Sequence, residues 1–424
     1  MKRRHTRRTS AGTWAALILT VAVLSVGTAV LLRLRSGSDE SVSLQAVQEV
    51  LNLNLPAAQQ GGHADAGAPV QPAVTLPPET AQVETRSGPN RTAFTLTIGG
   101  TVTVGTKLRQ AYYYSDSRKY DFTEVLSQLA PQMQADLCAV GWDNLVYADR
   151  KLSDNNTTAE ALRMLTSAGV DLALLGYPKV YDFGEAGLAA TVEAMNGLGL
   201  AEAGCTPMGT EPVRLMNVNG AAVAFLHYTQ SLTSSGNTAA KKSGTGGLPK
   251  ADADRIREDV AAARSAGANM TVVTVHWNAL KSTEPTKDQR RMAAQIAEAG
   301  ADLIVGMGDT PVQAAEWLES AGGRKTLCFY SVGSLMTAGR SNKDVAGALI
   351  QVRASVTDGV LNLEDVAVTP TYIWTFEQDK TTHFIALASN QPEPDGLDSR
   401  QRTAMGNALD RVRKIMTNSG IPLR

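Results

Sequence analysis

The chain has 424 residues, of which 43% are hydrophobic and 19% are charged, enough for one large domain with appendages. Its formal charge of −1 conceals an asymmetry, because residues 1–35 contain seven basic residues and no acidic one. Residues 36–424 therefore carry 33 basic against 41 acidic residues, a net charge of −8. An acidic body of this kind is a poor non-specific binder of nucleic acid, so we expect no nucleic-acid partner.

An uncharged run, "WAALILTVAVLSVGTAVLL", covers residues 14–32. As a helix it would span roughly 28 Å, close to the thickness of a bilayer's hydrocarbon core. Basic residues are more numerous before this run than after it, which predicts a single-pass anchor in the cell membrane, a cytoplasmic basic tail (1–13) and an extracellular main domain. A cleavable signal peptide is the alternative, but the run is long for one, and Arg33 and Arg35 stand where small residues are required.

The segment 33–92 is rich in Ala, Pro, Gly and Gln and is nearly free of aromatic residues. Such a composition cannot bury enough apolar surface to order itself, so we interpret the segment as a flexible linker. The three cysteines form no CxxC motif, so we expect no zinc-thiolate site. Cys138 and Cys328 lie inside apparent strands, where a free thiol acts as a small hydrophobe.

From Phe94 onward, patterns typical of strands and helices alternate. Strands are expected at 94–100, 135–141, 170–176, 270–276, 301–307, 326–333 and 383–389. Helices are expected at about 123–134, 157–168, 185–198, 251–266, 286–299, 312–321 and 399–419. Thr157 and Glu160 match a capping box, and Gly420 matches a helix C-terminal cap. Asn219-Gly220 and Asp358-Gly359 indicate hairpin turns, and 234–250 is expected to be a flexible loop. The pattern predicts a mixed α/β (α+β) fold, with two packed sheets and helices outside them in one large domain.

In such folds, functional groups gather beyond the carboxyl ends of the strands. The polar residues at these ends are Asp143 in "GWDN", Lys179 and Asp182 in "GYPKVYDFG", His276 in "HWN", Asp309 in "GMGDTP" and Ser334 in "GSL". On spacing alone, one histidine at a strand end is more often a structural residue, and aspartates after strands are more often turn residues or helix caps. Ser334 has no GxSxG turn and no evident base.

The order and text of these segments resemble the CapA family of poly-γ-glutamate and capsule synthesis proteins. The resemblance covers roughly residues 93–370 and is carried by "TSAGVDLALLG", "DFGEAGLAATVEAMNGLGL", "TVVTVHWN", "AEAGADLIVG" and "FYSVGSL". It implies a calcineurin-like metallophosphoesterase fold, a four-layer αββα sandwich following the transmembrane helix. Residues 371–424 would then be a C-terminal extension, a strand plus a helix, packing on that domain.

The residues that would carry the family's chemistry are largely replaced. The first aspartate of the family pattern falls at Gly100, and the Asn and Glu of its NLE motif fall at Gly141 and Asp143. Its NNH motif falls at 177–179, while the following Asp and Gly are kept as Asp182 and Gly184. HWG becomes 276–278, GHHPH becomes 306–310 and loses every histidine, and the Asn of YSLGN falls at Ser334. Two-metal phosphoesterase chemistry needs carboxylates and imidazoles around both ions, so we expect no two-metal centre.

The candidate catalytic residues are His276, Asp143 and Asp182. The candidate ligand-binding residues are Lys179, Trp277, Asn278, Tyr177, Trp142, Asp309 and Ser334. Aromatic walls with a lysine and two aspartates would suit a sugar or a peptide fragment, although both tryptophans could equally be core residues. We expect no cofactor; the alternative is one divalent ion (Mn, Fe or Zn) held by Asp143, Asp182, His276 and Asp309.

Three functional hypotheses follow. The first is a membrane-anchored pseudoenzyme of the metallophosphoesterase class, which binds an envelope polymer or a polymer-synthesis complex during capsule or poly-γ-glutamate synthesis or export. The second is a hydrolase with a reduced, one-metal site. The third is a structural or assembly protein of the cell envelope in which the cleft is unused.

Overall fold

The structure is a computed structural model that describes residues 90–207, 213–243, 250–278, 280–309, 311–338 and 345–424. The predicted basic tail, the predicted membrane anchor and all but the last three residues of the predicted linker lie outside these ranges. Among the described residues, none of the helices has the length and apolar character needed to cross a membrane. The described part of the chain falls within one compact unit, residues 84–424.

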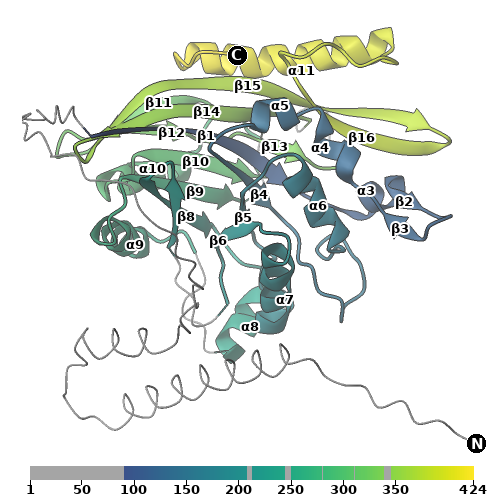
Figure 1. Cartoon of the computed structure of the whole chain (residues 1–424), viewed down its shortest axis with the longest axis horizontal. Helices are drawn as coiled ribbons and strands as arrows, with labels where there is room; N and C mark the ends of the chain where they lie inside the picture. The colour runs from purple at the N-terminus through teal and green to yellow at the C-terminus, as the bar shows by residue number, and fades with distance from the viewer. Residues whose placement is uncertain (1–89, 208–212, 244–249, 279, 310, 339–344) are drawn as a thin grey trace, which may run out of the picture. The chain divides into compact units, whose positions relative to one another are not determined.

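The predicted mixed α/β fold is confirmed, and it is built on two large sheets (Figure 1). The first has the order β16-β15-β14-β1-β4-β5-β6, with β13 also paired to β1. Its strands are β1 (Arg91–Val102), β4 (Leu137–Trp142), β5 (Leu172–Leu175), β6 (Ala201–Gly204), β13 (Ser334–Met336), β14 (Ala346–Thr357), β15 (Val360–Gln378) and β16 (Thr381–Ala388). The strands β1, β4, β5 and β6 run parallel, whereas β14, β15 and β16 form an antiparallel meander.

The second sheet has the order β11-β12-β10-β9-β8-β7. Its strands are β7 (Arg214–Val218), β8 (Ala221–Thr229), β9 (Met270–Trp277), β10 (Leu303–Gly308), β11 (Ala315–Glu319) and β12 (Lys325–Phe329). The four central strands are parallel, and antiparallel strands close both edges. A separate small hairpin pairs β2 (Tyr113–Tyr114) with β3 (Lys119–Tyr120).

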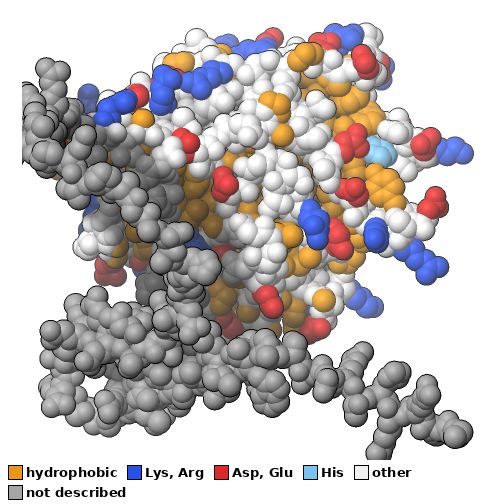
Figure 2. Space-filling model, in the orientation of Figure 1, with side chains coloured by type: hydrophobic (Ala, Val, Ile, Leu, Met, Phe, Trp, Pro, Cys, Tyr) orange, Lys and Arg blue, Asp and Glu red, His pale blue; other side chains and the backbone are white. Residues whose placement is uncertain are grey.

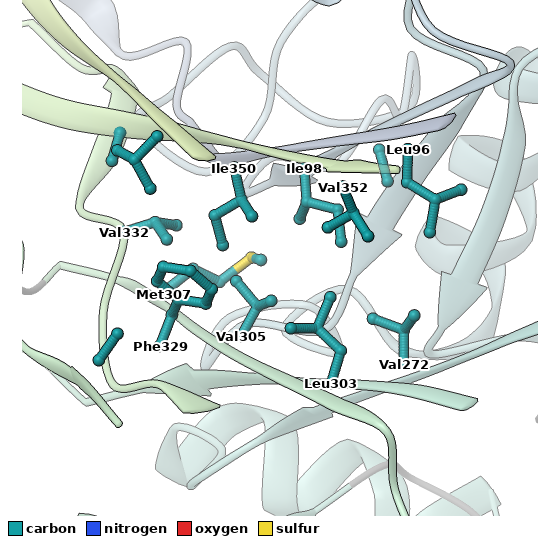
Figure 3. Packing of buried hydrophobic residues seen from close by; sticks show 14 of the residues in the cluster. Leu96, Ile98, Val272, Leu303, Val305, Met307, Phe329, Val332, Ile350 and Val352 are labelled. Carbon is teal, nitrogen blue, oxygen red and sulfur yellow. The ribbon is translucent and has the colours of Figure 1, made fainter. Parts of the chain in front are cut away.

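The main core lies between the two sheets, where Ile98 and Ile350 of the first face Val305 and Met307 of the second (Figure 3). These side chains are apolar at alternate positions because successive residues of a strand point to opposite faces. Burying both inner faces at once supplies most of the apolar burial that holds the sheets together.

Helices cover the outer faces of the sheets. A second core packs the first sheet against α3 (Thr106–Ala111), α4 (Thr123–Ser127), α5 (Ala130–Met133), α6 (Glu160–Ser167) and α7 (Gly184–Asn196). A third packs the second sheet against α9 (Ala253–Ser265) and α10 (Lys287–Glu298). The last helix, α11 (Ser399–Asn418), is an exception: it lies along β15 (Figure 1) on the inner face of the first sheet, and its Leu409 and Val412 belong to the main core.

Several local predictions are confirmed. The hairpin turns at Asn219-Gly220 and Asp358-Gly359 have positive φ at both residues, as two-residue turns of this kind require. Gly420 follows α11 with a φ of 70°, and all three cysteines are free and buried.

Other local predictions are wrong. Residues 312–321 contain the edge strand β11 instead of a helix, because pairing with β12 outweighs the helix propensity of Ala, Gln and Glu. The loop expected at 234–250 contains a helix, α8 (Ser234–Ser243), which packs on α7. The helix expected at 123–134 is two short helices, α4 and α5. The capping box at Thr157 is absent, since α6 begins after Ala159 without a side-chain cap.

Candidate functional site

The candidate site is a cavity of about 670 Å³ at the carboxyl ends of strands from both sheets. The chain reaches it just after β1, β4 and β5 of the first sheet and at the ends of β9 and β10 of the second, as strand-end reasoning predicts for α/β folds. The lining residues are Thr103, Gly105, Thr106, Lys107, Asp143, Asp154, Tyr177, Pro178, Lys179, His276, Asp309, Thr337 and Ala338. Five of the predicted site residues therefore share one cavity: Asp143, Tyr177, Lys179, His276 and Asp309.

His276 and Asp143 form a direct pair at the base of this cavity. The Nε2 atom of His276 lies 2.8 Å from Oδ2 of Asp143, and both residues are buried. Asp143 is positioned by a backbone hydrogen bond from its N–H to the carbonyl oxygen of Val102 at the end of β1. Gly308 packs beside the His276 ring, and its N–H donates to Oγ1 of Thr101, which links the two sheets a second time. The pair therefore lies where β1, β9 and β10 come together.

The other ring nitrogen of His276, Nδ1, is buried without a hydrogen-bond partner among the described residues. Burial opposes protonation of this ring, but the attraction and hydrogen bond of Asp143, with a contribution from Asp309, outweigh it and raise the pKa of His276 above its usual value. A Cβ atom built at Gly308 would lie 2.9 Å from Nδ1, so this buried nitrogen packs against the backbone of Gly308 and is not open to a ligand in the cavity.

A second histidine, His227, lies behind the site and is a neutral structural residue. Its Nδ1 is 2.7 Å from Oγ1 of Thr274, and the residue is buried. Burial, together with the nearby charge of His276, lowers the pKa of His227 to about 3. His227 therefore packs the region between the sheets and carries no charge near neutral pH.

The loop after β5 presents Tyr177 and Lys179 to the cavity. The Tyr177 hydroxyl donates to Oδ1 of Asn155 at 2.7 Å, and Nδ2 of Asn155 donates to the carbonyl oxygen of Lys179 at 3.3 Å. Burial, followed by the charges of Asp143 and Asp182, raises the pKa of Tyr177, so its hydroxyl stays protonated. Asn155 thereby fixes both residues, while the Lys179 side chain remains exposed to solvent.

Two charged residues of the lining were not predicted, Lys107 and Asp154. Asp154 accepts hydrogen bonds from the N–H and the hydroxyl of Thr106, each at 2.8 Å, and these two bonds, with the more distant Arg109 and Lys179, lower the pKa of Asp154. Lys107 follows the first strand by five residues, so reading further past that strand end would have found it. Asp154 precedes a helix and follows no strand, and the sequence holds no signal for its role.

The remaining predicted site residues do not line this cavity. Trp142 and Trp277 are buried in the outer cores, and the Trp277 indole N–H donates to the carbonyl oxygen of Tyr330 at 2.7 Å. Both tryptophans sit at strand positions whose side chains alternate away from the inner face. Oδ1 of Asp182 accepts hydrogen bonds from the hydroxyls of Thr233, just before α8, and Ser235, in its first turn. Asn278 accepts from the Ser231 hydroxyl at 2.7 Å, and Ser334 is buried in β13.

The residues at the family's metal-ligand positions do not fit a two-metal centre. A Cβ atom added at Gly100 would overlap the carbonyl oxygen of Gly333, so no carboxylate side chain can replace this glycine without moving the backbone. A Cβ at Gly141 would lie 2.8 Å from Sδ of Met307, whose side chain fills the space between the sheets (Figure 3). Glycine and methionine are not ligands for hard or borderline divalent ions. Within the described residues, no group of three or more His, Cys, Asp and Glu side chains is arranged to hold a metal ion.

Fold and site together define a mixed α/β protein of two facing sheets, with a polar cavity at their carboxyl ends. Residues 95–338 match the family described as bacterial capsule synthesis protein PGA_cap. This chain belongs to that family, as its resemblance to CapA proteins predicts.

Two relatives agree with this assignment. The PGA biosynthesis protein CapA of Bacillus subtilis (strain 168) is 28% identical over 196 residues, which is 46% of this chain and 49% of that protein. The capsule biosynthesis protein CapA of Bacillus anthracis is 25% identical over 197 residues, covering 45% and 46% respectively. The chain thus spans about half the length of these relatives.

The structure is also similar to that of the calcineurin-like phosphoesterase YfkN from Bacillus subtilis. The TM-score is 0.39 and the identity 12%, with 76% of this chain and 99% of the other covered.

Proposed function

We propose that this chain is a membrane-anchored binding or accessory protein of capsule or poly-γ-glutamate synthesis or export, with its main domain outside the cell. Residues 14–32 would form the anchor, and the acidic body would face an envelope polymer or a polymer-synthesis complex. The cavity around His276, Asp143 and Lys179 would bind a polar group of that polymer or of its precursor. Family membership supports the process, and the cavity supports a binding role.

One observation carries this proposal: the cavity retains a buried polar pair, whereas its described lining lacks the donor set of a two-metal site. Met307 and Gly308 stand where the family pattern has histidines. Lys179 places an ammonium group at the position of a further histidine of that pattern. An ammonium group repels a metal cation but attracts a carboxylate or phosphate. We therefore infer that the cavity takes a ligand and that it performs no metal-dependent phosphoester hydrolysis.

The hydrolase alternative needs Asp143, Asp182, His276 and Asp309 to converge. Three of these residues line the cavity, whereas Asp182 is engaged by Thr233 and Ser235. We expect purified full-length protein to contain no stoichiometric Mn, Fe or Zn and to leave generic phosphoesters unhydrolysed. Stoichiometric metal that is lost in His276→Ala would overturn the pseudoenzyme proposal.

The assembly alternative is tested in cells that make the polymer. We expect Lys179→Ala to reduce the surface polymer while the protein remains folded and abundant. The matched control is Lys414→Ala, an exposed lysine on α11 outside the cavity lining. A polymer level that stays unchanged in Lys179→Ala would favour a protein that acts as an assembly surface with an unused cavity.

A further inference from the structure

A second cavity, of about 550 Å³, adjoins the candidate site. It shares two lining residues with that site, so the two cavities meet at Lys107 of α3 and at Thr337, which directly follows β13. Its lining residues are Lys107, Gln110, Ala111, Thr337, Val345, Ile373, Thr375, Lys380, Thr381, Thr382 and Phe384. The floor is apolar, with Ile373 and Phe384 buried. The exposed residues of the lining are polar: Lys107, Gln110, Thr375 and Lys380.

The two cavities differ in charge. Three aspartates line the candidate site, whereas the described lining of the second cavity has two lysines and no acidic residue. Lys107 comes from α3 and Lys380 from the turn between β15 and β16, so the cations stand on separate elements. At one margin of the cavity, the Thr382 hydroxyl donates a hydrogen bond to Glu377. The other polar groups of the lining are the hydroxyls of three more threonines and the Gln110 amide.

Lys380 occupies a backbone position that would suit glycine better. It is the second central residue of the two-residue turn joining β15 and β16, with a φ of 62°, and Asp379 before it has a φ of 49°. Turns of this kind favour glycine because a side chain at positive φ is strained. The chain thus places a long cationic side chain at the rim of the cavity at a conformational cost.

The surface around the tip of the β15–β16 hairpin carries charged side chains of both signs. Figure 2 shows basic and acidic side chains projecting near apolar patches at the end where Figure 1 places the tip of the β15–β16 hairpin. The cationic lining is therefore local to the second cavity, because the surrounding surface carries both signs.

We propose that the second cavity is a subsite for an anionic group, a carboxylate or a phosphate, on an extended ligand whose neighbouring part occupies the candidate site. This inference rests on the proposed binding function. Lys107, at the boundary, would contact both parts of the ligand, and Lys380 would contact only the anionic group in the second cavity. Two cations on separate elements, with hydroxyl donors over an apolar floor, match such a group in charge and hydrogen bonding.

The test measures the binding of two probes to the full-length chain in mild detergent by calorimetry at low ionic strength. A short γ-linked glutamate oligomer supplies carboxylates, and inorganic tripolyphosphate supplies phosphates. Lys380→Gly removes the cation and suits the turn, so its melting temperature should not fall. We expect it to weaken binding of one of the probes about tenfold, the typical effect of losing one charge-assisted hydrogen bond, and to flatten the salt dependence.

The matched control is Asp379→Gly, which relieves the same turn and keeps Lys380; its affinity should stay within about twofold of wild type. Lys179→Gln reports separately on the candidate site. Binding that depends on Lys179 but is unchanged in Lys380→Gly would overturn the subsite and leave the proposed function standing. If neither probe binds to the wild-type chain, that result would count against the proposed function itself.

Discussion

The imidazole of His276 and the carboxylate of Asp143 lie 2.8 Å apart, although their positions in the chain differ by 133. Asp143 directly follows β4 of the first sheet, and His276 lies near the end of β9 of the second. The pair is one of the polar links between two sheets whose other contacts are mainly apolar. The pair also lies at two motif positions of the family that still carry a carboxylate and an imidazole, whereas Gly100, Gly141 and Met307 occupy other metal-ligand positions. A contact of this kind contributes both to stability and to the chemistry of the cavity.

The first prediction concerns the stability contributed by this pair. The pKa of His276 is raised in the folded state, so its contribution is complete below about 6.5, the ordinary histidine value, and is lost as pH rises through the raised value. His276→Gln should cost about 1–3 kcal/mol of unfolding free energy at about pH 6 and less at about pH 9. Urea unfolding at both pH values measures this, and an equal cost at both would contradict it.

Asp143→Asn provides the companion measurement. It removes the charge that holds the proton on His276, so it should abolish the same pH dependence. In the double variant, the two costs should not add, because each single change already breaks the contact. Additive costs would show that the two residues stabilise the fold independently.

The second prediction concerns acid sensitivity. The folded state keeps His227 neutral down to a pKa of about 3, whereas the unfolded chain takes up the proton near 6.5. The unfolded state therefore binds more protons in this window, and stability falls as the pH drops from about 6.5 towards about 3. His227→Gln should reduce that fall, by on the order of a few kcal/mol over the window. Acid unfolding curves that coincide with wild type would refute this role for His227.

The third prediction concerns the glycine beside the imidazole. Gly308 has a φ of 107°, and a Cβ there would lie 2.8 Å from Cε1 of His276 and from the carbonyl oxygen of Trp277. Gly308→Ala should therefore destabilise the protein by about 1–3 kcal/mol. Gly406→Ala on α11 is the control, because nothing lies within 4 Å of the added Cβ and alanine favours a helix; it should stabilise by about 0.5–1 kcal/mol. Thermal or urea unfolding decides both, and a neutral Gly308→Ala would contradict the crowding argument.

The fourth prediction concerns chelation. If the cavity holds no structural or catalytic ion, treatment with EDTA should leave the melting temperature unchanged. The affinity for whichever probe binds, the glutamate oligomer or tripolyphosphate, should also stay the same. Calorimetric scans before and after treatment measure this. A lower melting temperature that is restored by added Mn, Fe or Zn would indicate a metal site and would support the hydrolase alternative.

Sequence patterns predicted the parallel strands and the turns well because these depend on local chemistry. The buried strand of His276 is a run of β-branched residues, and Asn219-Gly220 supplies the positive φ that its turn needs. The edge strand at 315–319 was missed because its conformation depends on pairing with β12, which local propensity does not contain. The helix at 234–243 was missed for a similar reason, since its contacts are with α7.

For the site, the sequence alone determined the strand ends and the polar residues that follow them, because the carboxyl ends of parallel strands meet at one edge of a sheet. It also determined that the family's metal ligands are replaced. Only the tertiary structure decided which neighbours face the cavity: His276 points between the sheets, and Trp277, one residue later, points into an outer core. Asp154 joined the site, and Lys380 the adjoining cavity, because packing brought distant segments together, and that proximity is a property of the fold and not of any local pattern.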